Sequence, residues 1–127
     1  MYSFEPVQVT EAAPWRVETL QDRLSALKRP ASLRIAYIYT EAEAGTFRYR
    51  CWNMCRALKD YSNRIAGSFF FLSEYEAAGE IAATCDVMVF CRVQWSGRLA
   101  TFMSAGRAHG CRLLYDIDDF IFDPEFV

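Results

Sequence analysis

The sequence has little of what a metal site or a nucleic-acid interface needs. Its 127 residues contain a single histidine, His109, and none of the five cysteines stands in a CxxC pair. Structural zinc sites draw on such pairs and on further histidines, so we expect no bound metal. Lysine and arginine together number 14 against 16 acidic residues, and the net charge of −2 gives no electrostatic case for binding nucleic acid.

Long apolar runs are missing as well. No stretch reaches the ~18 consecutive apolar residues of a membrane-spanning helix, so the sequence predicts none. The first residues, Met1–Glu5, lack the basic and then apolar order of a secretory signal peptide. Five cysteines are an odd number for a disulfide framework, and buried thiols are typical of a reducing compartment. We therefore expect a cytoplasmic protein.

The residues that are present favour a packed domain, because 53% are hydrophobic and 16% are aromatic. Runs of apolar residues, several of them unbroken, alternate with stretches whose apolar residues recur at helical spacing. Unbroken apolar runs are typical of strands buried on both faces of a parallel sheet. The sequence thus predicts an α/β, Rossmann-like three-layer domain with a parallel sheet of about four strands. The expected strands cover residues 33–40, 64–72, 86–91 and 111–117, and the helices between them cover 46–61, 73–83 and 95–108.

The N-terminal part stands apart from this alternation. Residues 1–30 are expected to form an arm and then an amphipathic helix over 14–28, which Pro30 ends, whereas 31–127 form the Rossmann-like unit. A helix with a narrow apolar stripe can dock on a second copy, so the segment Trp15–Leu27 predicts a homodimer contact. The stripe consists of Val17, Leu20, Leu24 and Leu27.

Helical spacing also predicts which side chains face the core. Trp52 falls off the apolar stripe of its helix and is expected to be exposed. The apolar face of the helix over 46–61 holds Phe47, Cys51, Met54, Cys55 and Leu58. That of the helix over 95–108 holds Trp95, Leu99, Phe102 and Gly106.

Open parallel sheets bind ligands beyond the carboxyl ends of their strands, and this rule selects the segments that follow each strand. After the first strand, Gly45 permits a sharp turn and Thr46 can cap the next helix. Free backbone N–H groups there, with Arg48 and Arg50 nearby, suit a phosphate or carboxylate. The alternative is a capped surface helix with solvated arginines. After the third strand, Arg92 either clamps a ligand or forms a salt bridge to an acid at the end of the fourth strand, Asp116 or Asp118.

The fourth strand ends in Y-D-I-D-D, which places three carboxylates within four residues. Asp116, Asp118 and Asp119 can together bind a hard cation, orient sugar hydroxyls or supply a base. Alternatively, Asp118 or Asp119 caps a following turn while Asp116 pairs with an arginine.

Three stretches together resemble the N-terminal domain of GT-B fold glycosyltransferases. They are G-T-F-R-Y-R-C-W-N-M after the first strand, V-F-C-R at the end of the third, and L-L-Y-D-I-D-D-F-I-F at the fourth. The resemblance covers roughly residues 33–123 and is closest to the group-1, family 4-like enzymes that build bacterial surface polysaccharides. It departs from the usual pattern at the first loop, where Gly45 stands alone instead of in a glycine-rich pair.

The resemblance implies the acceptor-side half of a two-domain enzyme. A C-terminal domain in the same polypeptide would hold the nucleotide-sugar, and such enzymes need no metal or other cofactor. The acceptor would be a glycan or a lipid-linked sugar, which leaves peripheral membrane association open. It implies that Asp116, Asp118 and Asp119 line the catalytic cleft, and that Gly45, Thr46, Arg48, Arg50 and Arg92 contact the acceptor or an anion. The alternative is a stand-alone α/β module without catalytic activity, either receiver-like or oligomerising.

Overall fold

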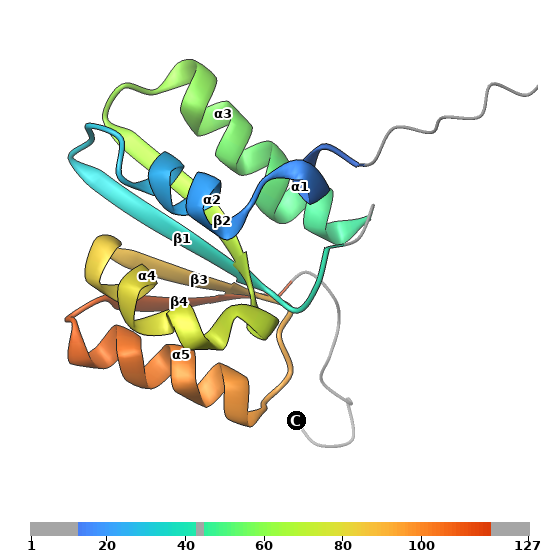
Figure 1. Cartoon of the computed structure of the whole chain (residues 1–127), viewed down its shortest axis with the longest axis vertical. Coiled ribbons are helices and arrows are strands. Elements are labelled where there is room, and N and C mark those ends of the chain that lie inside the picture. Colours follow the sequence, from blue (N-terminus) through green and yellow to red (C-terminus); the bar gives the residue numbers. More distant parts are fainter. Residues whose placement is uncertain (1–12, 43–44, 118–127) are drawn as a thin grey trace, which may run out of the picture.

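The computed structural model describes residues 13–42 and 45–117, and these form one α/β unit (Figure 1). Its sheet has four parallel strands in the order β2-β1-β3-β4. The predicted fold class is confirmed, and each strand lies within two residues of its expected position because buried parallel strands require the apolar runs seen in the sequence. The strands are β1 (Leu33–Tyr39), β2 (Ile65–Phe71), β3 (Val87–Cys91) and β4 (Arg112–Asp116).

Helices cover both faces of the sheet and enclose two hydrophobic clusters (Figure 1). The helices of the first face are α2 (Leu20–Leu27), the 3₁₀ helix η2 (Leu72–Ala77), α4 (Ala78–Thr84) and α5 (Gly97–Ala108). Their cluster includes Ile38, Phe70, Met88, Phe90 and Phe102. The second face carries α1 (Pro14–Val17), the π-helical turn η1 (Arg48–Trp52) and α3 (Asn53–Tyr61). Its cluster includes Trp15, Tyr37, Phe47, Cys51 and Phe69.

The helix expected over 14–28 is in fact two helices. Thr19 interrupts it as an N-cap: its Oγ1 accepts a hydrogen bond from the Asp22 N–H at 3.1 Å, and its own N–H donates to Asp22 Oδ2 at 2.9 Å. Leu24 and Leu27 are buried in the core of this chain, whereas Val17, expected on the stripe, is 69% exposed. The stripe that suggested a homodimer contact therefore packs mainly inside the same molecule.

The π-helical turn explains a second correction. The N–H of Asn53 donates to the carbonyl of Arg48, five residues earlier, so the turn holds one residue more than an α-helical turn. This insertion shifts the helix face, and the regular spacing assumed from the sequence fails there. Trp52 was expected to be exposed but is buried, and Met54 was expected in the core but is 45% exposed.

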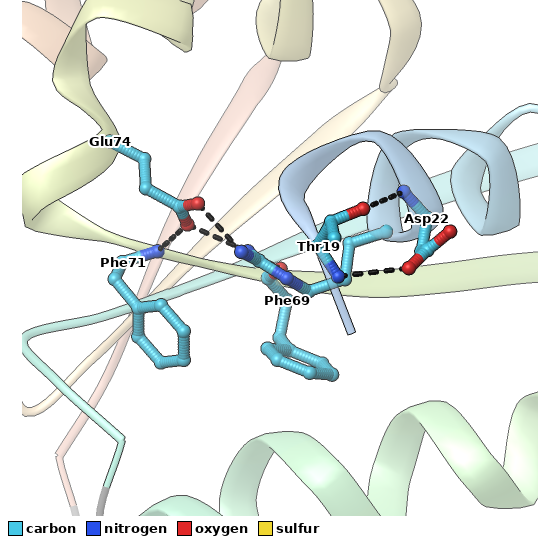
Figure 2. A network of polar contacts seen from close by, with 6 residues as sticks. Thr19, Asp22, Phe69, Phe71 and Glu74 are labelled. Carbon is cyan, nitrogen blue, oxygen red and sulfur yellow. Dashed lines mark hydrogen bonds and ion pairs between the residues drawn. The ribbon is translucent and has the colours of Figure 1, made fainter. Parts of the chain in front are cut away.

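A buried ion pair ties α2, β2 and η2 together. Arg23 is 5% exposed, and its two terminal nitrogens each lie 2.6 Å from a carboxylate oxygen of Glu74. Its Nη1 also donates to the carbonyl of Phe69 at 3.0 Å, and Glu74 accepts from the N–H of Phe71 at 2.9 Å. Figure 2 shows this network beside the Thr19 cap. The guanidinium also lies over the rings of Phe69 and Phe71, at 5.3 and 5.2 Å.

A second arginine occupies the same edge of the sheet. β2 is an edge strand, and Arg29 donates hydrogen bonds to the carbonyl of Ile65 and to those of Leu58 and Ser62 at the end of α3. Arg23 and Arg29 thus satisfy two carbonyls of β2 that a further strand would otherwise use.

We predict that Arg23→Ala lowers the free energy of unfolding by about 3–5 kcal/mol, because it leaves the Glu74 carboxylate, which is only 16% exposed, without its partner. Urea denaturation at neutral pH measures the loss. Lys28→Ala is the matched control: Lys28 and Glu80 lie 3.4 Å apart with both side chains about half exposed, and such a pair contributes about 0–1 kcal/mol. Equal losses in the two variants would contradict a special role for the buried pair.

Candidate functional site at the switch point of the sheet

The strand order reverses between β1 and β3, and this is where the crevice of an open parallel sheet forms. The chain leaving β1 leads to η1 and α3 on one face, and the chain leaving β3 leads to α5 on the other. The two exits therefore diverge and leave a space at the carboxyl edge. A cavity of about 410 Å³ lies there. Its walls come from Thr40 after β1, Leu72 after β2, and Arg92, Gln94, Trp95 and Ser96 after β3.

Arg92 opens the β3 exit in a strained conformation. Its φ of 51° lies in the left-handed region, which non-glycine residues seldom adopt. Two contacts hold it there: its N–H donates to the carbonyl of Asp116 at 3.0 Å, and its Nη1 donates to Thr46 Oγ1 at 2.7 Å. Such strain persists only where the surroundings impose it and often marks a functional segment. The contact to Asp116 is through the backbone, and the alternative salt bridge to Asp118 concerns a residue outside the described part of the chain.

The carboxylate of Asp116 pairs instead with Arg50. Arg50 Nη1 lies 3.3 Å from both carboxylate oxygens, and the two side chains are 41% and 33% exposed. This pair matches the part of the alternative interpretation in which Asp116 pairs with an arginine, and the partner comes from the G-x-x-R-Y-R stretch 66 residues earlier. Asp118 and Asp119 lie outside the described residues.

The rest of the first loop joins the same site. Thr46 was expected to cap the following helix, but its hydroxyl accepts from Arg92 instead. The carbonyl of Gly45 accepts from the N–H of Arg48 at 3.0 Å, and Arg48 is exposed. The contacts therefore form a ring that runs from Thr46 to Arg92, to Asp116, to Arg50 and back along the chain to Thr46.

Trp95 lies outside the helix in which it was expected. It was expected on the buried face of a helix over 95–108, but α5 begins at Gly97 and Trp95 is 75% exposed. Ser96 sets this boundary, because its hydroxyl accepts from the N–H of Leu99 at 3.1 Å. A serine before the apolar pattern is an N-cap signal that could have placed Trp95 and Gln94 in the loop.

Buried thiols lie beneath the carboxyl edge. Cys51 and Cys91 are almost fully buried, and the neighbouring Cys91 thiol together with burial raises the pKa of the Cys51 thiol. Burial likewise raises the pKa of Cys55. Thiols with raised pKa values are poor nucleophiles at neutral pH, so these cysteines serve packing, as expected from the sequence.

Tyr37 lies in the same cluster as these thiols and is 7% exposed. Burial, reinforced by the neighbouring thiols, raises the pKa of its hydroxyl to about 12.

A larger hollow of about 510 Å³ lies elsewhere, between α2 and α3 along the edge strand β2. Its charged walls balance, and Arg29 in them is already bound to backbone carbonyls. We place the candidate site at the switch point instead. The charged residues of the larger hollow are Glu18, Asp22, Asp60, Arg29, Arg56 and Lys59.

Two features are absent from residues 13–42 and 45–117. No three histidine, cysteine, aspartate or glutamate side chains gather closely enough to hold a metal ion. No helix in this part of the chain has both the length and the apolar character to cross a membrane.

We predict that Arg92→Ala is less stable than Arg92→Gly by about 1 kcal/mol. Both variants lose the hydrogen bond to Thr46, but the left-handed φ at this position is strained for alanine and not for glycine. Thermal and urea unfolding of the two variants measure the difference. An alanine variant as stable as the glycine variant would show that the left-handed conformation carries no strain.

We also predict that Tyr37→Phe reduces the loss of stability between pH 10 and 12, to which the buried thiols with raised pKa values also contribute. The unfolded hydroxyl ionises near its ordinary pKa of 10, whereas the folded one ionises at about 12. The stabilisation is therefore complete below pH 10 and is lost as the pH rises toward 12. Urea titrations at intervals from pH 9 to 12 measure it, with Tyr61→Phe, which alters a side chain that is 89% exposed, as the control.

Comparison of the chain with models of known protein families, with curated proteins and with solved structures found no match.

Proposed function

We propose that this chain is the acceptor-side half of a GT-B glycosyltransferase of the group-1, family 4-like kind. It would take part in moving a sugar from a nucleotide-sugar to a glycan or lipid-linked acceptor. One observation supports this most: the three stretches that carry the sequence resemblance converge on one ring of contacts. Arg50 comes from the first stretch, Arg92 from the second and Asp116 from the third.

The ring lies beside the switch-point cavity, where a ligand of an open parallel sheet is expected. Asp116 and Arg50 are partly exposed, so their oxygen and nitrogen atoms can still exchange hydrogen bonds with sugar hydroxyls. Asp118 and Asp119 continue the acidic stretch in the sequence and belong to the same proposed cleft.

Transfer requires donor and acceptor to be held in register. The donor-binding half is proposed to belong to the same polypeptide, so the 127-residue chain alone should be inactive. The nucleotide-sugar is the donor substrate and no other cofactor is invoked. A cytoplasmic location, supported by five free thiols, is part of the proposal, and a lipid-linked acceptor would bring the enzyme to the membrane surface.

The alternative is a stand-alone binding module. The observation in its favour is that the residues lining the cavity come from this one domain. A receiver-like version gains no support, because a phosphorylatable aspartate would be needed after β3 and Arg92 stands there. An oligomerising version gains none from the N-terminal helix, because Leu24 and Leu27 are buried.

We predict that Asp116→Asn and Arg50→Gln in the native polypeptide lower kcat/KM for sugar transfer by about tenfold or more, a loss of ~1.4 kcal/mol of transition-state stabilisation. Both should change the free energy of unfolding by less than about 1 kcal/mol, because the pair is partly exposed. The assay measures transfer of labelled sugar from a panel of nucleotide-sugars to membrane and glycan acceptors. Glu80→Gln, which alters a surface ion pair, is the control.

Two results would contradict the proposal. One is turnover of a nucleotide-sugar by the isolated 127-residue chain. The other is a native polypeptide whose intact mass matches this chain alone, since it would lack a donor-binding half, and the binding module would then be the better account.

A further inference from the structure

The switch-point cavity contains an aromatic side chain that the fold does not use. Of the three tryptophans in the sequence, Trp15 and Trp52 are buried, whereas Trp95 is 75% exposed and lines the cavity. Leaving an indole in water forgoes the stabilisation that its burial would bring. Trp95 contributes little to the core, and its position beside the cavity favours a ligand that would cover the indole.

The other walls of the cavity are mostly polar. Thr40 and Ser96 offer hydroxyls, Gln94 offers an amide, and Arg92 offers a guanidinium. Leu72 is the apolar exception. A cavity lined by an indole and by hydrogen-bonding groups suits a pyranose ring, whose C–H face can pack on the indole while its hydroxyls bind the polar side chains. The volume of about 410 Å³ lies at the lower end of the ~300–1,000 Å³ typical of small-molecule sites.

Part of this wall is held in place before any ligand binds. Arg92 is fixed at its backbone by the carbonyl of Asp116 and at its side chain by Thr46. Ser96 is fixed as the cap of α5, and as an acceptor it keeps its own O–H free to donate. Groups that are already ordered lose little entropy on binding, which favours specific recognition.

We propose that this cavity is a carbohydrate subsite in which Trp95 stacks on a sugar ring and Arg92, Gln94 and Ser96 bind its hydroxyls. The choice of ligand rests on the proposed function, of which this subsite would be the acceptor-binding part. A nucleobase is disfavoured because one aromatic wall faces several polar groups, whereas a base is usually held between two apolar surfaces.

Binding to the 127-residue chain itself tests the subsite. The probes are the methyl glycosides of glucose, galactose, N-acetylglucosamine and glucuronic acid, with uridine monophosphate as a nucleotide and glycerol as a simple polyol. The indole N–H resonance of Trp95 and the backbone amide resonances of Ser96 and Gly97 report binding by NMR. At least one glycoside should shift them, with a dissociation constant of roughly a millimolar or below.

Variants then assign the binding to the indole. Trp95→Ala should weaken binding about tenfold or more and Trp95→Phe less, because phenylalanine keeps an aromatic face. Tyr61→Ala removes an aromatic ring that is 89% exposed on α3 and should bind as the unaltered chain does. Because Trp95 is exposed, its replacement should leave the fold intact, and circular dichroism checks this.

Three results would overturn the subsite: no glycoside of the panel shifts these resonances, uridine monophosphate binds more tightly than every glycoside, or Trp95→Ala binds as well as the unaltered chain. The binding test and the transfer assay can fail independently of each other. Transfer by the native polypeptide without a sugar subsite at Trp95 would leave the proposed function standing. Sugar binding by the chain, together with no transfer by the native polypeptide, would support the subsite and favour the stand-alone module.

Discussion

The burial of Arg23 is the constraint on which much of the fold depends. A guanidinium removed from water is tolerable only beside a carboxylate and further acceptors, and Glu74 and the carbonyl of Phe69 supply them. Its Nε has no hydrogen-bond partner among the described residues, so the bonds at the other end of the group must outweigh that cost. The docking of α2 on the sheet therefore depends on the position of η2, because η2 places Glu74 beside Arg23 at the end of β2. That position also brings Leu72 to the cavity at the switch point.

The candidate site likewise depends on a few contacts between residues far apart in the sequence. The carboxyl edge gathers the exits of all four strands, but topology alone would leave them as separate loops. Asp116 joins them, because its side chain binds Arg50 and its carbonyl accepts from the strained Arg92. Arg92 in turn reaches Thr46. A single aspartate at the end of β4 thereby orders the loops after β1 and β3.

The sequence predicted strands and the edge that carries the site because both follow from local patterns: unbroken apolar runs, and residues placed just after them. It could not predict features that depend on a departure from regular geometry or on distant partners. The extra residue in the π-helical turn moved Trp52 inward, and the cap at Ser96 released Trp95 from its helix. The partnership of Arg50 and Asp116 spans 66 residues, and no local pattern distinguishes Arg50 from Arg48 as the partner.

The arginines on β2 have a consequence for self-association. Sheets polymerise when each molecule offers two open edges, one to give and one to receive a neighbouring strand. Arg23 and Arg29 occupy carbonyls of β2 that an incoming strand would need, so that edge cannot receive one. Among the described strands, the edge left for such pairing is β4. One usable edge permits a closed pair but not an endless ribbon, and the protein is thereby guarded against fibre growth through its sheet.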